Sequence, residues 1–257
     1  MKMFDEEIVD RIDAISKNKK LIDIANNFMS ESTIPKYCYN FKWQNRPIIQ
    51  YPQDVLAMQE IIWKVKPDLI IETGIAHGGS LIFSASMLTL LDIQDCHEQK
   101  KDTLHLKESK RRVLGIDIDI RKHNKEKILE HSMSNKIDML EGSSISDEII
   151  EKVHNYAESY EKILICLDSN HTFDHVYSEL LAYASLVSID SYCVVFDTIV
   201  NDLPEGTYPD RPWGQNNNPK TAVKKFIADN HNFIIDKDIC NKLLITVSPD
   251  GFLKRVN

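Results

Sequence analysis

Short apolar segments alternate with helical segments along most of this chain, and that alternation limits the possible fold more than any other feature. Apolar runs typical of buried parallel strands are LIIETG, RVLGIDID, KIDMLEG, KILICLD and SYCVVFDT. Stretches with apolar residues at helical spacing separate these runs. The pattern predicts a single α/β domain, in which helices cover both faces of a mostly parallel sheet.

The two ends of the chain depart from this rhythm. Residues 232–236 and 242–256 predict two strands close together in sequence, the second with a Pro-Asp-Gly turn, so we expect an antiparallel edge. Residues 1–50 predict a helical and aromatic extension, and residues 51–257 predict the α/β domain. The densely charged residues 96–112 predict an exposed insertion within that domain.

The composition excludes several classes of protein. With 257 residues, of which 42% are hydrophobic and 27% charged, the chain is neither disordered nor a coiled coil. Lysine and arginine number 31 against 39 acids, and this net charge of −8 argues against nucleic-acid binding. No apolar run approaches the roughly 18 residues of a membrane span. The acidic start is no secretory signal, and five scattered cysteines predict a reduced, cytoplasmic protein without zinc.

Polar and acidic residues stand where the predicted strands end. Ligands of an open parallel sheet bind beyond the carboxyl ends of its strands. Helix capping would account for one or two acids there, but four of the five strands end in a carboxylate. These acids are Glu72, Asp117, Asp168 and Asp197, and the remaining strand is followed by Gly142, Ser143 and Ser144. We therefore expect the binding site at this edge of the sheet.

The segment ETGIAHGGS follows the first strand and predicts a cofactor loop. Its glycines are expected to allow a tight turn and a close approach to a ligand, before a helix N-terminus at Ser80. Glu72 would repel a pyrophosphate and suits a cationic or amino-bearing ligand, which favours S-adenosylmethionine over a dinucleotide. Asp117 is predicted to hold the ribose hydroxyls. The glycines of the loop are Gly74, Gly78 and Gly79.

Two acids at neighbouring strand ends predict a metal site. Asp168 and Asp197 offer hard oxygen ligands for Mg²⁺, with Thr198 or Asp202 as a further ligand. The alternative is that Asp168 contacts the cofactor and Asp197 caps a loop.

Two histidines follow Asp168 at a helical spacing of four residues. We expect both His171 and His175 on one face of the following helix, with His171 in its first turn and facing the cleft. A neutral imidazole is able to accept a proton near pH 7, so His171 is the candidate general base. The alternative for His171 is a helix cap or a hydrogen bond to a neighbouring loop, and His175 is expected to be structural.

Five motifs in order resemble the cephalosporin hydroxylase/rhamnosyl O-methyltransferase family. They are PDLIIETGIAHGGS, CLDSNHTFDHV, VVFDTIVND, RPWGQNNNPKTAV and NKLLITVSPDGFLKR, so the resemblance runs from about Tyr51 to the C-terminus. It implies a Rossmann-like class I methyltransferase fold with a seven-stranded sheet, S-adenosylmethionine as cofactor, often a divalent metal, and O-methylation of a sugar or antibiotic hydroxyl. In metal-binding relatives an acid commonly stands in the place of Phe196, so three-carboxylate coordination is not expected here.

We predict an S-adenosylmethionine-dependent, Mg²⁺-assisted O-methyltransferase that acts on a hydroxyl of a sugar, a glycan or a glycosylated metabolite, and we expect it to form homo-oligomers. A hydroxylase is the first alternative, but no 2-His-1-carboxylate triad stands out. A non-catalytic S-adenosylmethionine-binding protein and a nicotinamide dehydrogenase are further alternatives. The acids at the strand ends argue against the former, and Glu72 against the latter. Trp213 and residues 37–43 are candidates for stacking on a sugar ring, with packing as the alternative.

Overall fold

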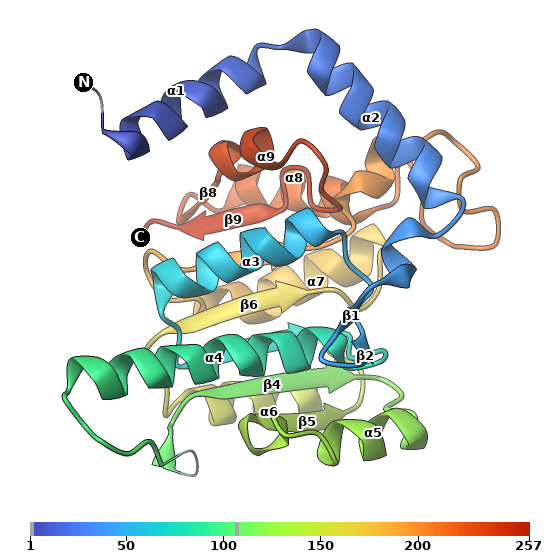
Figure 1. The fold of residues 1–257 in the computed structure, drawn as a ribbon. Helices are drawn as coiled ribbons and strands as arrows, with labels where there is room; N and C mark the ends of the chain where they lie inside the picture. The colour runs from blue at the N-terminus through green and yellow to red at the C-terminus, as the bar shows by residue number, and fades with distance from the viewer. Residues whose placement is uncertain (1–2, 106–107) are drawn as a thin grey trace.

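The computed structural model describes residues 3–105 and 108–257, and its centre is a seven-stranded sheet in the order β5-β4-β3-β6-β7-β9-β8 (Figure 1). The first five strands in this order pair in parallel, whereas β9 runs antiparallel to both of its neighbours, β7 and β8. The predicted mostly parallel sheet with an antiparallel edge is therefore confirmed. The strands are β3 (Leu69–Thr73), β4 (Arg112–Asp117), β5 (Ile137–Glu141), β6 (Ile163–Leu167), β7 (Tyr192–Val195), β8 (Phe233–Ile235) and β9 (Phe252–Arg255).

Helices cover both faces of this sheet (Figure 1). Helices α3 (Pro52–Val65), α4 (Gly79–Glu98) and α5 (Lys122–Leu129) lie on one face, and α6 (Asp147–Ala157), α7 (Phe173–Tyr183) and α8 (Pro219–Asp229) on the other. Successive side chains of a strand point to opposite faces, so Ile70 joins the core under α3 and α4, while Leu69 and Ile71 join the core under α6 and α7. Burial on both faces explains why the strands read as unbroken apolar runs.

The last part of the chain differs from the prediction. Residues 237–243 form helix α9 (Lys237–Leu243), and only Phe252–Arg255 of the predicted strand 242–256 is a strand. The carboxylate of Asp54 on α3 accepts the hydroxyl of Thr246 and, at 3.0 Å, the backbone N–H of Val247. These bonds to a helix replace the ladder bonds that a strand would make. The apolar sequence of this segment therefore fills the core as a loop.

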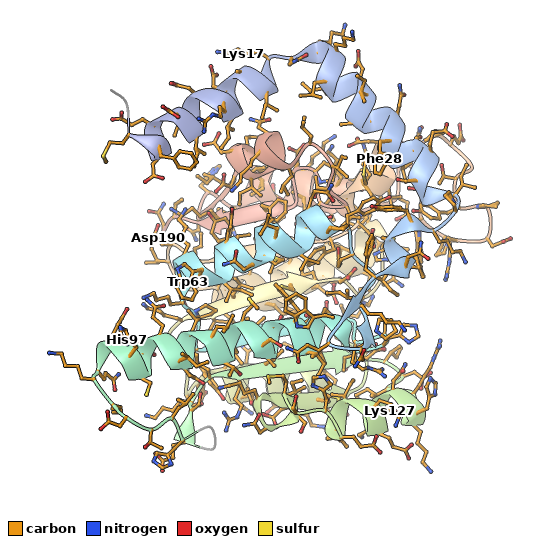
Figure 2. All side chains as sticks on the ribbon, viewed as in Figure 1. Lys17, Phe28, Trp63, His97, Lys127 and Asp190 are labelled. Carbon is orange, nitrogen blue, oxygen red and sulfur yellow. The ribbon has the colours of Figure 1, made fainter. Side chains whose placement is uncertain are left out.

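The N-terminal residues form a bent helical arm above the domain (Figure 1). Helix α1 (Phe4–Ser16) buries no residue, whereas α2 (Lys19–Thr33) buries Ala25, Met29 and Ser32. Phe28, labelled in Figure 2, meets the rings of Tyr37 and Tyr51 edge-on. Both helices lie within the predicted extension 1–50, and the division of the chain at residue 50 stays a prediction.

Residues 41–50, here named the strap, connect this arm to the domain. The strap contains the hairpin of β1 (Lys42–Trp43) and β2 (Arg46–Pro47) and follows the 3₁₀ turn Tyr37–Asn40. Trp43 packs on Phe83 of α4, and its Nε1 donates to Ser86 Oγ at 3.1 Å. Tyr37 likewise packs on its aromatic neighbours. These two aromatics support the packing alternative rather than contact with a sugar.

The charged insertion is shorter than predicted and is anchored at its end. Helix α4 continues to Glu98 and β4 begins at Arg112, so both ends of the predicted 96–112 segment belong to regular elements. Arg111 forms ion pairs of 2.7 Å with both Asp92 and Asp95. Residues 106 and 107 of the predicted insertion lie outside the described residues. Within the described ranges, no helix is both long enough and apolar enough to cross a membrane.

Candidate active site

The site lies where the strand order reverses, between β3 and β6. From β3 the chain continues to one side through β4 and β5, and β6 begins the other side, so the loops after β3 and β6 diverge and leave a crevice. Gly74 follows β3 with φ +91°, and a Cβ on it would lie 2.0 Å from the carbonyl oxygen of Asp168. Gly74 therefore allows the backbone of the loop after β6 to approach closely, rather than a ligand. A side chain here would push the two loops apart.

Asp117, at the end of β4, braces the predicted cofactor loop. Its Oδ2 accepts the backbone N–H groups of Ile75 at 2.8 Å and Ala76 at 3.2 Å. Ala76 holds a left-handed conformation with φ +45°. This conformation costs free energy and persists only where the surrounding structure holds it. The carboxylate of Asp117 thus positions the cofactor loop. The same carboxylate is predicted to bind the ribose, and its remaining lone pairs are available to a ligand.

The strap holds the same loop from the other side. The Nε of Arg46 donates to the carbonyl oxygen of His77 at 2.9 Å, and its Nη2 donates to Asn124 on α5 at 3.1 Å. A Cβ on Gly79 would lie 2.1 Å from the carbonyl oxygen of Pro47. His77 contributes its backbone to this contact. The strap therefore belongs to the site, although sequence reasoning assigned it to the extension.

An acid-lined cavity lies under the strap. Its polar lining consists of Gln50, Asp54, Glu72, Ser80, Ser84 and Asp168. Burial raises the pKa of Glu72 to about 7 although it accepts a hydrogen bond from Ser80, and burial likewise raises the pKa of Asp54 to about 7. Burial, together with the charges of Asp197 and Glu72, holds the pKa of Asp168 well above its ordinary value. The cavity thus favours a positively charged ligand.

Asp168, His171 and Asp197 form a cluster at the mouth of this crevice. Potential metal-binding atoms of the three side chains all lie within 4.8 Å of one another, and all three residues are partly buried. The Nε2 of His171 lies 3.1 Å from Oδ2 of Asp197. Two carboxylates and one imidazole are a donor set that suits a divalent cation.

The structure corrects the predicted position of His171. Helix α7 begins at Phe173, so His171 lies in the loop before the helix and not in its first turn. The Oδ1 of Asn170 accepts the backbone N–H of Thr172 at 2.9 Å, which forms a turn, and Thr172 is extended. This turn directs the imidazole toward Asp197. His171 and His175 therefore do not share a helix face.

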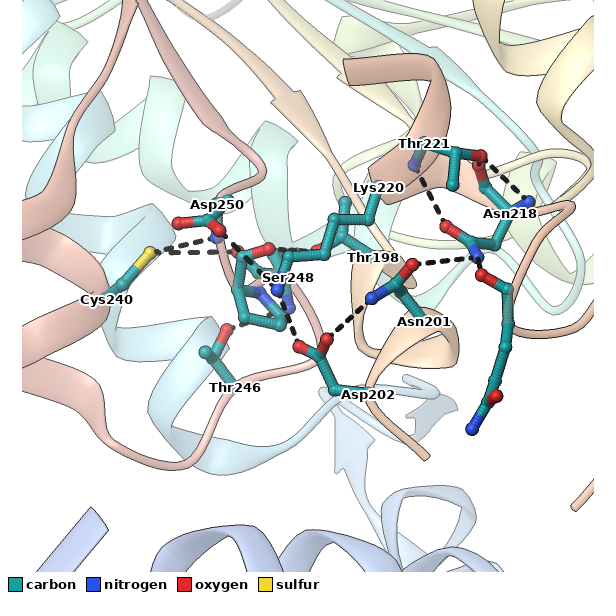
Figure 3. Close-up of polar contacts among 12 residues, drawn as sticks. Thr198, Asn201, Asp202, Asn218, Lys220, Thr221, Cys240, Thr246, Ser248 and Asp250 are labelled. Atoms are coloured by element: carbon teal, nitrogen blue, oxygen red, sulfur yellow. Dashed lines mark hydrogen bonds and ion pairs between the residues drawn. The ribbon is translucent and has the colours of Figure 1, made fainter. Parts of the chain in front are cut away.

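The two further metal ligands offered by the sequence have other partners. Thr198 is fully buried, and its hydroxyl donates to the carbonyl oxygen of Pro249 at 2.7 Å. Asp202 forms an ion pair of 2.6 Å with Lys220 (Figure 3). The cluster that the structure brings together instead contains His171 as its third member.

A buried polar group joins the loops after β5 and β6. Ser144 and Ser169 each donate to Oε1 of Glu179, at 2.6 and 2.7 Å. Their hydroxyl protons are thereby used, so both oxygens accept from Nε2 of His175, each at 3.1 Å. The structural role predicted for His175 agrees with these contacts. Sequence reasoning missed Glu179, whose only signal was its position one helical turn after His175.

The loops containing Ser144 and Trp213 complete the crevice. Gly142 and Ser143 form the turn between β5 and α6, with Gly142 at φ +154°. Trp213 meets the ring of His171 edge-on, with centroids 4.8 Å apart, and Arg211 lies over the indole. An aromatic side chain therefore borders the carboxylate cluster.

Comparisons with known proteins place the chain among methyltransferases. The family model described as "Rhamnosyl O-methyltransferase/CmcI" matches residues 35–256. The rhamnosyl O-methyltransferase of Mycobacterium bovis is 28% identical over 206 residues, which are 79% of this chain and 73% of the relative. The match to the family model begins before residue 51 and so includes the strap.

Solved structures show the same fold. A structure of CmcI with Mg and SAM superposes with a TM-score of 0.52 at 16% identity, over 85% of this chain and 78% of that chain. The TDP-rhamnose 3'-O-methyltransferase CalS11 gives a TM-score of 0.52 at 15% identity, over 93% of this chain and 94% of that chain. The predicted Rossmann-like architecture is therefore confirmed.

Proposed function

The chain belongs to the rhamnosyl O-methyltransferase/CmcI family, and we propose that it transfers a methyl group from S-adenosylmethionine to a hydroxyl of a sugar, with the assistance of Mg²⁺. The family predicted from the sequence motifs is confirmed, and with it the assignment as an O-methyltransferase. The observation that carries the proposal for this chain is the Asp168–His171–Asp197 cluster beside an acid-lined cavity at the switch point of the sheet.

The residues of the cavity fit S-adenosylmethionine. The cofactor carries a positive sulfonium and an ammonium group, and the cavity offers buried carboxylates. In the described part of the chain, no lysine or arginine forms an ion pair with Asp54, Glu72 or Asp168. A cationic ligand supplies the charge that these acids lack. The structure of CmcI named above was solved with this cofactor.

The residues of the cluster also fit Mg²⁺. This cation prefers oxygen ligands and usually needs only one or two carboxylates, with water and substrate oxygens as the others. Asp168 and Asp197 would hold it, and no acid at Phe196 is required. When bound, the ion supplies Lewis-acid polarisation of the acceptor hydroxyl. One histidine with two acids is not the 2-His-1-carboxylate set of an iron oxygenase, so the hydroxylase alternative is not favoured.

His171 would act as the general base of the transfer. Its Nε2 faces the carboxylate of Asp197, which orients the ring and stabilises the imidazolium formed when a proton is accepted. Trp213 packs edge-on against the ring and limits its rotation. Because Mg²⁺ prefers oxygen, His171 is not needed as a ligand and is free to accept the proton of the hydroxyl. Positioning of the two reactants supplies the remaining acceleration.

The acceptor is a small molecule or glycan with a free hydroxyl, and we propose a deoxyhexose such as rhamnose. The curated relative and CalS11 are both named for rhamnose substrates, and Trp213 offers an aromatic face beside the cluster. We also propose that the chain works in the cytoplasm as a homo-oligomer. All five cysteines are free, which agrees with a reducing compartment.

The proposal is tested by methyl transfer from S-adenosylmethionine to rhamnosides, followed by mass spectrometry, with and without Mg²⁺. We expect methylated sugar that depends on Mg²⁺ in the parent and is lost in Asp197→Asn. A chain that methylates none of these sugars, although it binds the cofactor, would direct the search to a different acceptor class.

A further inference from the structure

Gln50, the last residue of the strap, contains a buried polar atom without a partner. Its Nε2 donates to Oδ2 of Asp168 at 3.3 Å, and the residue is only 7% exposed. Its Oε1 is buried and has no hydrogen-bond partner among the described residues. A buried amide oxygen left unpaired costs free energy, so its presence in this position requires a reason.

The direction of this amide follows from its neighbour. The NH₂ group of Gln50 faces Oδ2 of Asp168 and donates to it, so the carbonyl oxygen of the amide turns away from this carboxyl group. Gln50 lines the same cavity as Glu72, Ser80 and Asp168. The unpaired oxygen therefore belongs to a lining whose other polar members are mostly acceptors.

A ligand that satisfies this lining needs several hydrogen-bond donors and a positive charge. Glu72 and Asp168 are carboxylates, and Gln50 contributes a third acceptor from a different segment of the chain. A primary ammonium carries three N–H donors and one positive charge, and it has no acceptor that would meet the carboxylates. A carboxylate would be repelled here, and a sulfonium has no N–H to donate. The apolar side chains of Met58, Phe83 and Phe196 also line the cavity and limit access of water.

We propose that Gln50 accepts a hydrogen bond from the α-ammonium group of the cofactor's amino-acid portion. The strap would then recognise the methionine end of S-adenosylmethionine, opposite its adenine. This inference rests on the proposed function and assigns a specificity-determining role within it. Arg46 of the same strap fixes the cofactor loop at His77, so ammonium binding and loop positioning come from one segment.

The test compares two probes by calorimetry in excess EDTA. One is S-adenosylhomocysteine, and the other is its analogue in which hydrogen replaces the α-amino group. The parent is expected to bind S-adenosylhomocysteine more tightly. Gln50→Leu should weaken S-adenosylhomocysteine by roughly 10- to 100-fold, the loss expected for a hydrogen bond to a charged group, and should change the deaminated analogue by less than about threefold.

Gln53→Leu is the matched control. Gln53 is also a glutamine with a buried, unpaired Oε1, but it does not line the cavity, so its replacement should leave both affinities unchanged. If Gln50→Leu does not fold, Gln50→Asn is the second variant. Its side chain is shorter by one methylene, so its amide oxygen no longer reaches the ligand, and it should show the same selective loss.

Three outcomes overturn the inference. They are an equal loss for both probes in Gln50→Leu, an unchanged affinity for S-adenosylhomocysteine, and a loss that appears only when the titration is repeated with Mg²⁺ in place of EDTA, because the oxygen would then serve the metal. A parent that binds neither probe overturns the proposed function itself.

Discussion

The imidazole Nε2 of His171 lies 3.1 Å from Oδ2 of Asp197, although the two residues stand in the loops that follow different strands. This contact gives the imidazole a carboxylate partner within the same cluster that suits a divalent cation. Because Mg²⁺ prefers oxygen, we propose that Asp197 binds the ion and orients the imidazole, while His171 accepts the proton.

Replacement of His171 by Gln should lower kcat by roughly 10²- to 10⁴-fold, because the side chain no longer accepts the proton of the hydroxyl. The affinity for S-adenosylhomocysteine and the Mg²⁺ concentration for half-maximal activity should stay unchanged. Steady-state kinetics and calorimetry measure these quantities. His123→Gln, an exposed substitution on α5, is the control. A large shift in Mg²⁺ dependence with little change in kcat would make His171 a metal ligand instead.

Chelation by EDTA should abolish turnover, and added Mg²⁺ should restore it. Asp197→Asn should raise the Mg²⁺ concentration for half-maximal activity by at least roughly 10- to 100-fold. This is the loss of metal affinity that removal of an outer-shell partner causes, and a direct ligand should matter at least as much. Asp202→Asn should have no such effect, because Asp202 pairs with Lys220. Full turnover in excess EDTA would remove the metal from the reaction.

Replacement of Asp117 by Ala should weaken S-adenosylhomocysteine binding by at least tenfold. Each charge-assisted hydrogen bond that is lost contributes about 1.5–3 kcal/mol, so the loss of one is enough for this effect. The structure adds a second cause, since the N–H groups of Ile75 and Ala76 lose their acceptor. Calorimetry on a variant of verified fold measures the affinity. An unchanged affinity would show that Asp117 contacts neither the ribose nor a loop that matters for binding.

Stability of the ligand-free protein should fall as pH rises from about 4.5 to about 7. Burial raises the pKa of Glu72 from 4.5 to about 7, so in this window the folded protein binds more protons than the unfolded chain. The free energy of unfolding then decreases with pH, by at most about 1.4 kcal/mol per unit for one group, and the contribution is complete below the unfolded pKa.

Glu72→Gln should flatten this dependence, because it is neutral and keeps an oxygen for the hydroxyl of Ser80. Asp54 has the same direction of shift, so part of the slope should remain. Denaturant unfolding at several pH values measures it, with Glu151→Gln, which is exposed on α6, as the control. An identical slope in Glu72→Gln and the parent would contradict the burial of a titrating Glu72.

The strand ends were predictable because their placement follows from chain direction. In a parallel sheet every carboxyl end meets the same edge, so Glu72, Asp117, Asp168 and Asp197 come together without knowledge of packing. The apolar runs that precede them have the length and composition typical of buried parallel strands. The fold and the acidic character of the site therefore follow from local sequence.

Residues positioned by tertiary contacts were not predictable. Gln50 reaches the cavity because the strap packs on α4 through Trp43 and holds the cofactor loop through Arg46, and the partners of both residues lie more than 30 positions away. Glu179 acts through serines of two other loops. His171 was placed on a helix because periodicity does not reveal the turn made by Asn170. Such contacts override local propensity.

The most direct test of the account is the transfer of a trideuteromethyl group from labelled S-adenosylmethionine to rhamnose-containing acceptors by the purified chain. Mass spectrometry and NMR of the product would locate the label. The account predicts a trideuteromethyl ether on a sugar oxygen, formed with Mg²⁺ and lost in His171→Gln. A label found on carbon, nitrogen or an aromatic hydroxyl, with sugar oxygens unmodified, would contradict it.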